Sequence, residues 1–186
     1  MRCHIKIVYL SLPPVLATAE TNNSSTKDMK RIDIAVPVTA LRDDELTETD
    51  RVLVMKAREA TYRAYAPYSK FHVGAAILLD NGEIVTGSNQ ENAATPSSLC
   101  AERTAAYYAH STYPDAKFKT IAIAARDTTG SELADPISPC GACRQALLEF
   151  ETLAGHNVRV VLAGSRQCYV LDSVHSLLPL SFTHFE

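Results

Sequence analysis

Three cysteines and one glutamate form the pattern in this sequence that could do chemistry. Cys100 begins a Cys-Ala-Glu triplet that ends at Glu102, and Cys140 and Cys143 form a Pro-Cys-x-x-Cys motif about forty residues later. A catalytic zinc ion takes three protein ligands and keeps a fourth position for water, so three thiolates are enough to hold it. Glu102 is too close to Cys100 in the sequence to be an obvious fourth ligand. It is well placed to move protons to and from water on the metal.

A Cys-x-x-Cys pair alone is also compatible with a redox dithiol or a disulfide framework. A redox pair is expected to follow a strand of a thioredoxin-like unit, and it would leave the triplet Cys100–Glu102 unexplained. A metal site accounts for both halves of the pattern, and persistent thiols predict a reducing, cytoplasmic location. Two of the five cysteines, Cys3 and Cys168, lie outside the pattern. We interpret them as an incidental thiol and a small buried residue.

Length and composition suit one globular domain with a single core. The chain has 186 residues, of which 46% are hydrophobic and 21% are charged, which is enough to bury a core. Its formal net charge is −3 and its basic residues are not clustered, so a nucleic-acid partner is disfavoured. The apolar stretch near the N-terminus is too short to span a bilayer. The predicted partner is therefore a small molecule without strong negative charge.

The first 28 residues fit poorly into a folded domain. They combine an apolar run, broken by Pro13 and Pro14, with a polar run rich in Thr, Asn and Ser. The basic start also makes a weak match to a signal peptide, but a thiolate metal site argues against export. We predict a disordered or spurious extension at 1–28, with Met29 as the functional start, a lead-in at 29–46 and the catalytic domain at 47–186.

The predicted elements give an α/β sandwich. Thr47–Asp50 has the Ser/Thr-x-x-acid form of a helix start, and Asn81-Gly82 is a strong hairpin signal. Cys100 and Cys140 fall at helix N-termini, where the helix dipole favours thiolate. In chain order we expect a helix at 51–65, strands at 71–79 and 83–88, a helix at 100–109, a strand at 120–125, a helix at 141–151, and strands at 158–163 and 167–170. This order predicts a three-layer α/β/α sandwich with a mixed five-stranded sheet and both ligand-bearing helices on one face.

The two cysteine motifs resemble those of the cytidine deaminases, specifically the homotetrameric form whose zinc ligands are all cysteines. The resemblance rests on Cys100–Glu102 and Pro139–Cys143 and extends from Leu46 to Phe182, about three quarters of the chain. It implies one Zn²⁺ per chain, the cytidine deaminase-like fold and Glu102 as the catalytic acid and base. The implied reaction is hydrolytic deamination of cytidine and 2′-deoxycytidine to uridine and 2′-deoxyuridine plus ammonia, as in pyrimidine salvage.

The resemblance also implies substrate-binding residues outside the motifs. In the family, an Asn-x-Glu after the second hairpin strand holds the ribose, which assigns Asn89 and Glu91 to the sugar. Without the resemblance, a turn-forming Asn and a solvated Glu would be the simpler interpretation. Phe71 and Ala101 would line the substrate pocket.

Two further roles follow from the same resemblance. Arg103 would hydrogen-bond the ligand sulfurs and offset the negative charge of three thiolates; the alternative is a surface arginine. Phe182 would reach from an apolar C-terminal segment into the active site of a neighbouring subunit, so that active sites are shared within the homotetramer. The alternative is that Phe182 packs on its own subunit.

Three other functions fit parts of the pattern. A blasticidin-type deaminase would use the same cysteine ligands on a different aminated base, although Asn89, Glu91 and Phe182 favour a nucleoside. A polynucleotide deaminase should have a basic channel and usually a His-Ala-Glu half-site, and this sequence has neither. A structural zinc protein would need a fourth ligand, for which Cys168 is the candidate.

Overall fold

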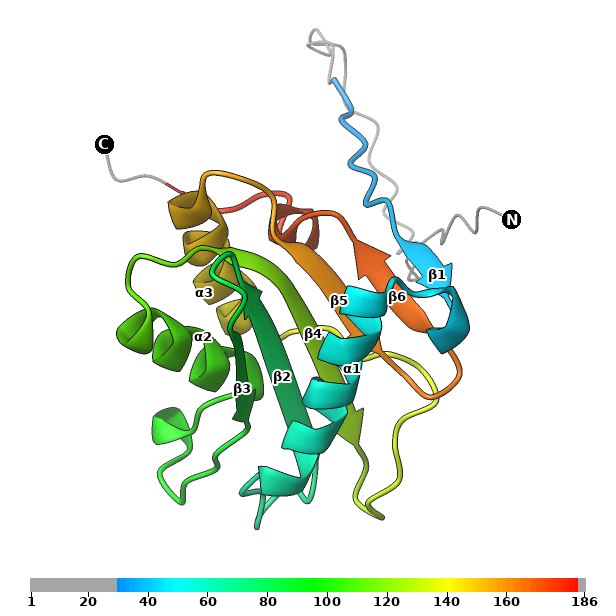
Figure 1. The fold of residues 1–186 in the computed structure, drawn as a ribbon, viewed down its shortest axis with the longest axis vertical. Helices are drawn as coiled ribbons and strands as arrows, with labels where there is room; N and C mark the ends of the chain where they lie inside the picture. Colours follow the sequence, from blue (N-terminus) through cyan, green and yellow to red (C-terminus); the bar gives the residue numbers. More distant parts are fainter. Residues whose placement is uncertain (1–29, 184–186) are drawn as a thin grey trace, which may run out of the picture.

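The computed structural model describes residues 30–183, and the extension predicted at 1–28 lies outside the described residues (Figure 1). The elements are β1 (Thr39–Leu41), α1 (Glu48–Ala60), β2 (His72–Leu79), β3 (Ile84–Ser88), α2 (Ala101–Thr112), β4 (Phe118–Arg126), α3 (Gly141–Ala154), β5 (Arg159–Ala163) and β6 (Cys168–Leu171), with short 3-10 helices η1 (Asp43–Glu45), η2 (Thr61–Arg63), η3 (Thr95–Ser97) and η4 (Val174–Leu177). Every helix and strand expected from the sequence is present, with ends that differ by a few residues.

The sheet has the strand order β1-β6-β5-β4-β2-β3. β4 and β5 run parallel and are joined through α3, whereas the other neighbouring pairs are antiparallel. The prediction of a mixed sheet is confirmed, but the sheet has six strands instead of the predicted five because β1 was not expected. Three residues carry too short an alternating pattern to identify a strand. β1 forms because Thr39 and Leu41 pair with Val170 and Cys168 of β6.

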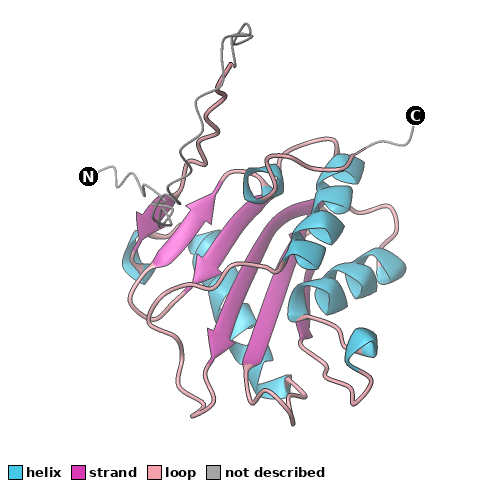
Figure 2. Ribbon diagram, turned by 180° about the vertical axis from the view of Figure 1, so that it is seen from behind, coloured by secondary structure: helices cyan, strands magenta, loops and turns pink. Residues whose placement is uncertain are grey.

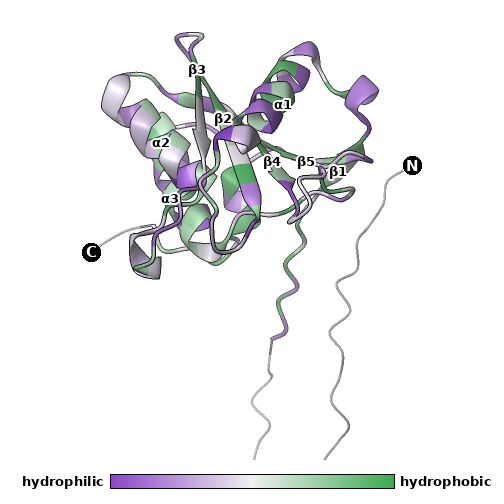
Figure 3. Cartoon of the chain, turned by 90° about the horizontal axis from the view of Figure 1, so that it is seen from below, coloured by the Kyte–Doolittle hydropathy of each residue, from purple (hydrophilic) through white to green (hydrophobic). Residues whose placement is uncertain are grey.

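Helices cover both faces of the sheet and complete the three layers (Figure 2). Successive strand residues point to opposite faces, so Ala122 of β4 joins a core cluster with Leu53 of α1. Its neighbour Ile121 joins a second cluster with Ala105 of α2 and Leu147 of α3. Hydrophobic and hydrophilic positions alternate along the helices (Figure 3), as expected for helices with one face on a sheet. The two ligand-bearing helices therefore share one face, as predicted.

The start of α1 and the β2–β3 hairpin form as their local sequences predict. The Thr47 hydroxyl accepts a hydrogen bond of 3.1 Å from the backbone N–H of Asp50 and caps α1. Gly82 has a φ of 88°, the left-handed conformation that an Asn-Gly turn needs. The helix predicted to reach residue 65 ends at Ala60, and the chain continues as the 3-10 helix η2.

Gly87 lets β3 approach α2 closely. A Cβ atom at Gly87 would lie 2.5 Å from the backbone nitrogen of Ala105 and 2.7 Å from the carbonyl oxygen of Ala101. α2 cannot retreat without moving Cys100, so we expect Gly87→Ala to lower the free energy of unfolding by about 2 kcal/mol and to weaken zinc binding. Urea denaturation and zinc titration measure both effects.

Gly141 provides the stability control for this prediction. A Cβ atom there meets no heavy atom within 4 Å, and the residue is the first of α3. Gly141→Ala is expected to leave the free energy of unfolding unchanged or slightly higher, because alanine favours helix more than glycine does. Equal losses in both variants would show that the close approach of β3 to α2 is not the cause.

Candidate active site

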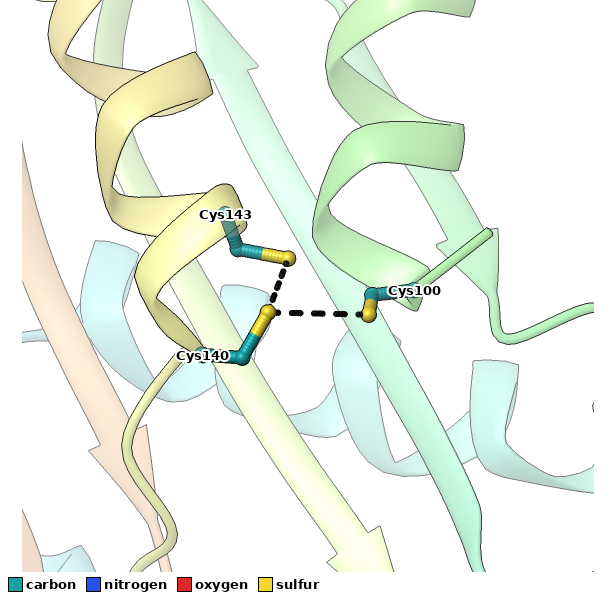
Figure 4. Close-up of side chains that lie close together, drawn as sticks. All are labelled: Cys100, Cys140 and Cys143. Carbon is teal, nitrogen blue, oxygen red and sulfur yellow. Dashed lines mark hydrogen bonds between the residues drawn. The ribbon is translucent and has the colours of Figure 1, made fainter. Parts of the chain in front are cut away.

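Three cysteine sulfurs meet where α2 and α3 begin (Figure 4). Cys100 and Cys140 are the N-cap residues of the two helices, and Cys143 lies in the first turn of α3. The Sγ atoms of Cys100 and Cys140 are 3.9 Å apart, those of Cys140 and Cys143 are 3.4 Å apart, and all three lie within 4.8 Å of one another. Tetrahedral zinc with Zn–S bonds of about 2.3 Å places its sulfurs about 3.8 Å apart. The donor set and its spacing therefore fit a zinc ion.

Cys168 is not part of this group. Its Sγ donates a hydrogen bond of 3.4 Å to a carboxylate oxygen of Asp43, and burial together with this contact raises the pKa of the Cys168 thiol to about 11. A raised pKa disfavours the thiolate that zinc needs. Among residues 30–183, the cysteines that come together are Cys100, Cys140 and Cys143. Three ligands are typical of an open, catalytic zinc site rather than a closed, structural one.

The environment of Cys100 favours a thiolate. A hydrogen bond with Cys143 and one of 3.8 Å from Arg103 Nη2 lower the pKa of Cys100 to about 5. The hydrogen bond to Cys100, together with burial, raises the pKa of Cys143. Thiolates this close repel one another, so the metal-free cluster does not ionise fully at neutral pH. A divalent cation between the sulfurs would remove that repulsion.

Arg103 is hydrogen-bonded to the cysteine cluster. Its Nη2 donates to Cys100 Sγ, and this hydrogen bond raises the pKa of Arg103 above its ordinary value. The Nε atom of Arg103 is buried without a hydrogen-bond partner. A buried donor beside a sulfur cluster suits an anionic centre, because three thiolates around one Zn²⁺ keep a net negative charge. The arginine is thus a contact of the sulfur cluster rather than a surface residue.

Glu102 is a buried carboxyl next to the sulfur cluster. It lies in the first turn of α2 and is 4% exposed. Burial raises the pKa of the Glu102 carboxyl above its ordinary value of 4.5, and the negative charge at Cys100 raises it further. A carboxyl with a raised pKa both takes and gives protons more readily near neutral pH than a solvated one. This is the property that a proton-transfer group requires.

The charged form of Glu102 destabilises the metal-free protein at neutral pH. Because folding raises the pKa of Glu102 above 4.5, the folded state binds this proton more tightly than the unfolded chain does. The stability that the protonated carboxyl adds to the folded state is fully present below the pKa of Glu102 in the unfolded chain. It is lost as the pH rises through the pKa of Glu102 in the folded state. We therefore expect metal-free Glu102→Gln to melt several degrees above the metal-free wild type at neutral pH.

The difference in melting temperature should shrink as the pH falls below 4.5, where the wild-type carboxyl becomes protonated in both the folded and the unfolded state. Thermal denaturation in the presence of a chelator, across the acidic to neutral range, measures it. A gap of equal size at every pH would contradict the buried-charge explanation.

The end of β3 is hydrogen-bonded to the segment that leads into the cysteine cluster. Gln90 and Leu99 exchange backbone hydrogen bonds of 2.8 and 2.9 Å, and Leu99 is the residue before Cys100. Asn89 and Glu91 flank Gln90, so both lie next to the segment that leads into the cluster. The predicted sugar-binding pair and the metal ligands are thus joined by a short backbone bridge.

The side chains of Asn89 and Glu91 make hydrogen bonds to nearby backbone. Asn89 accepts from a backbone N–H of β2 at 2.7 Å and donates to the carbonyl oxygen of Phe71 at 2.9 Å. The Glu91 carboxylate accepts from the backbone N–H groups of Ser69 and Tyr68, and hydrogen bonds from Ser69 are the main reason that its pKa is lowered. Asn89 therefore ties Phe71 to the end of β3, while Glu91 stays ionised.

The other two predicted substrate residues differ in exposure. The side chain of Ala101 is fully buried, so its substrate contact would have to come from its backbone. Phe182 is 59% exposed, and its carbonyl oxygen accepts a hydrogen bond of 2.8 Å from Gln145 of α3. The contact of Phe182 with a neighbouring subunit stays a prediction.

Sequence analysis did not single out Arg144. This arginine follows Cys143 directly, and it donates hydrogen bonds to Ser138 and Pro139, the two residues before Cys140, and to Leu177 near the C-terminus. Its position directly after Cys143 was the signal available in the sequence, but no sequence pattern predicts its hydrogen bond to Leu177.

A surface cavity of about 420 Å³, lined by residues 80–81 and 112–116, lies at the opposite end of α2 from the cysteines.

Residues 47–156 match the family described as the cytidine and deoxycytidylate deaminase zinc-binding region. The chain is 41% identical over 131 residues to the cytidine deaminase of Sporosarcina psychrophila, an alignment that covers 70% of this chain and 89% of the relative. It is 38% identical over 133 residues to that of Halalkalibacterium halodurans, covering 72% of this chain and 93% of the relative.

Solved structures of cytidine deaminases have the same fold. The crystal structure from Burkholderia pseudomallei superposes with a TM-score of 0.62 at 35% identity, covering 74% of this chain and all of that one (100%). The structure from Mycobacterium tuberculosis superposes with a TM-score of 0.58 at 33% identity, covering 75% and 100%. Within residues 30–183, no helix is long and apolar enough to cross a membrane. The family match contains both cysteine motifs and Glu102, and the chain belongs to the zinc-binding cytidine deaminase family.

Proposed function

We propose that this chain hydrolyses cytidine and 2′-deoxycytidine to uridine and 2′-deoxyuridine, with release of ammonia. The observation that carries the proposal is a cluster of three cysteine sulfurs beside the buried carboxyl of Glu102. The relatives that share the fold are named cytidine deaminases. The net charge of −3 favours an uncharged nucleoside over a nucleotide substrate.

Glu102 carries the proton transfers of the proposed reaction. Cys100, Cys140 and Cys143 would hold the zinc ion, which when bound would lower the pKa of water enough for a hydroxide nucleophile at neutral pH. Glu102 takes one proton from the attacking water and donates it to N3 of the pyrimidine, which makes C4 electrophilic as the hydroxide oxygen adds there. Glu102 then takes the hydroxyl proton at C4 and donates it to the amino group, so that the C4–N bond breaks and ammonia leaves. Water thus provides the new carbonyl oxygen, one proton on N3 and one on ammonia.

The proposal includes roles for the residues around the reacting base. Asn89 and Glu91 bind the ribose, and Phe71 and Ala101 line the pocket. Support comes from the backbone bridge between Gln90 and Leu99 and from the hydrogen bonds that tie Asn89 to Phe71.

The quaternary and cellular context is also part of the proposal. Phe182 contacts the base from a neighbouring subunit of a homotetramer, and its exposed side chain suits such a contact. The enzyme acts in cytoplasmic pyrimidine salvage, where cysteine ligands stay reduced.

A substrate series tests the proposed specificity. Purified zinc-loaded protein is offered cytidine, 2′-deoxycytidine, deoxycytidylate and a blasticidin-type antibiotic, and each product is separated by chromatography. We expect both nucleosides to be converted, with the other two turned over far more slowly. Faster turnover of the antibiotic would assign the site to another aminated base.

A further inference from the structure

Arg144 holds together two segments that are far apart in the sequence. Its Nε donates to the carbonyl oxygen of Pro139 at 2.8 Å, and its Nη2 donates to the hydroxyl of Ser138 at 2.9 Å. Its Nη1 donates to the carbonyl oxygen of Leu177 at 2.9 Å. A guanidinium presents its donors in a rigid, planar fork. The turn that carries Cys140 and the start of the C-terminal segment are therefore held in one geometry.

Two more residues of α3 hold the same C-terminal segment. Gln145 Nε2 donates to the carbonyl oxygen of Phe182 at 2.8 Å. Near the other end of α3, the buried carboxylate of Glu151 accepts from the backbone N–H groups of Val174 at 2.8 Å and His175 at 3.0 Å. The helix that supplies two of the three cysteines is thus also the support of the C-terminal segment.

Apolar packing alone does not hold the segment beyond Leu177. Leu177 is 9% exposed, whereas Leu180 is 82% and Phe182 is 59% exposed. A terminal segment with so little burial frays unless polar contacts hold it. Leu178 still packs against the core, and the hydrogen bonds from Arg144 to Leu177 and from Gln145 to Phe182 contribute to holding the two ends of the segment.

We infer that Arg144 is a positioning residue, which aligns the segment carrying Phe182 with the turn carrying Cys140, and that Gln145 is its second anchor. The inference rests on the proposed function, in which Phe182 contacts the substrate base bound in a neighbouring subunit. Arg144 itself would touch neither the metal nor the substrate. Its removal should therefore affect substrate binding through Phe182 rather than proton transfer at Glu102.

Kinetics of Arg144→Gln test this role. Because a lost hydrogen bond from a charged group changes binding by about tenfold or more, we expect KM for cytidine to rise about tenfold. The value of kcat, the pH profile and the zinc content should change little. Arg144→Lys keeps the charge without the fork, so it should recover only part of the loss. Arg51→Gln is the matched control, because Arg51 pairs with Glu48 on α1, away from this segment.

A double-mutant cycle separates positioning from a purely structural role. If Arg144 acts through Phe182, the combined Arg144→Gln and Phe182→Ala variant should have nearly the same KM as Phe182→Ala alone. If the combined variant instead showed the product of the two single effects on KM, the inference would be overturned. Loss of zinc from Arg144→Gln would also overturn it, because the residue would then serve the cysteine turn alone.

Hydrogen exchange provides a readout that does not depend on turnover. In zinc-loaded Arg144→Gln, amides of residues 177–182 should exchange about tenfold faster than in the wild type, while those of α1 stay unchanged. Unchanged exchange at 177–182 would contradict the positioning role even in an active enzyme. Faster exchange in a protein that does not convert cytidine would refute the proposed function but keep the anchoring. If Arg144→Gln does not fold, Gln145→Ala carries the same test at Phe182.

Discussion

Glu102→Gln is expected to retain its zinc and to lose cytidine turnover by about 10⁴-fold, the upper end of what one acid–base group contributes. The size of the loss follows from the proposed mechanism, in which the same carboxyl moves both protons. Glutamine has nearly the same shape but can neither take nor deliver a proton at this site. Steady-state kinetics and a zinc count on the same preparation measure the two properties.

Glu149→Gln is the matched control for this prediction. Glu149 lies on α3 and is exposed, so its replacement removes a carboxylate without touching the sulfur cluster. Its kcat and KM should equal those of the wild type. Substantial turnover by Glu102→Gln would remove Glu102 from the mechanism, whereas loss of zinc would assign it to metal binding.

Cys143→Ser is expected to remove zinc and activity together. Cys143 is fully buried and lies 3.4 Å from Cys140 Sγ, so a serine there leaves two thiolates, which is fewer ligands than zinc sites use. Dialysed protein should fall from about one zinc per chain to less than about 0.1. Its melting temperature should fall as well, because binding free energy at a metal site adds to folding free energy.

Cys168→Ser is the control for Cys143→Ser, because it replaces a buried cysteine that is not a predicted zinc ligand. Cys168 is also fully buried, but its thiol donates to Asp43, and a serine hydroxyl can make the same hydrogen bond. This variant should keep its zinc and its turnover. If Cys168→Ser lost zinc while Cys143→Ser kept it, the three-cysteine centre would be wrong.

The sequence was sufficient where the determinants are local. Helix capping predicted the start of α1 at Thr47, the Asn-Gly pair predicted the β2–β3 hairpin, and the two cysteine motifs predicted the cysteine cluster. The helix cap and the hairpin depend on residues within one turn, and the cysteine cluster depends on two short motifs about forty residues apart. The shared face of α2 and α3 followed from the order of the elements.

The sequence did not predict the features that depend on contacts between residues far apart in the chain. β1 exists because it pairs with β6, about 130 residues away, and the alternating pattern in β1 is too short to be seen. The contact from Arg144 to Leu177 and those from Glu151 to η4 join segments that no local pattern relates. The helical spacing in α1 predicted an end at residue 65, but α1 ends at Ala60, and Tyr65 instead forms a backbone bridge with Gln90.

Cytidine turnover measured as a function of bound zinc tests whether the three-cysteine site is the catalytic centre. Metal is removed from the purified protein with a chelator, zinc is returned in steps, and uridine formation and zinc per chain are measured on each sample. We expect turnover to be absent without metal and to rise in proportion to zinc until about one ion is bound per chain, as for one three-cysteine site. Full turnover in metal-free protein, or none at one zinc per chain, would contradict this expectation.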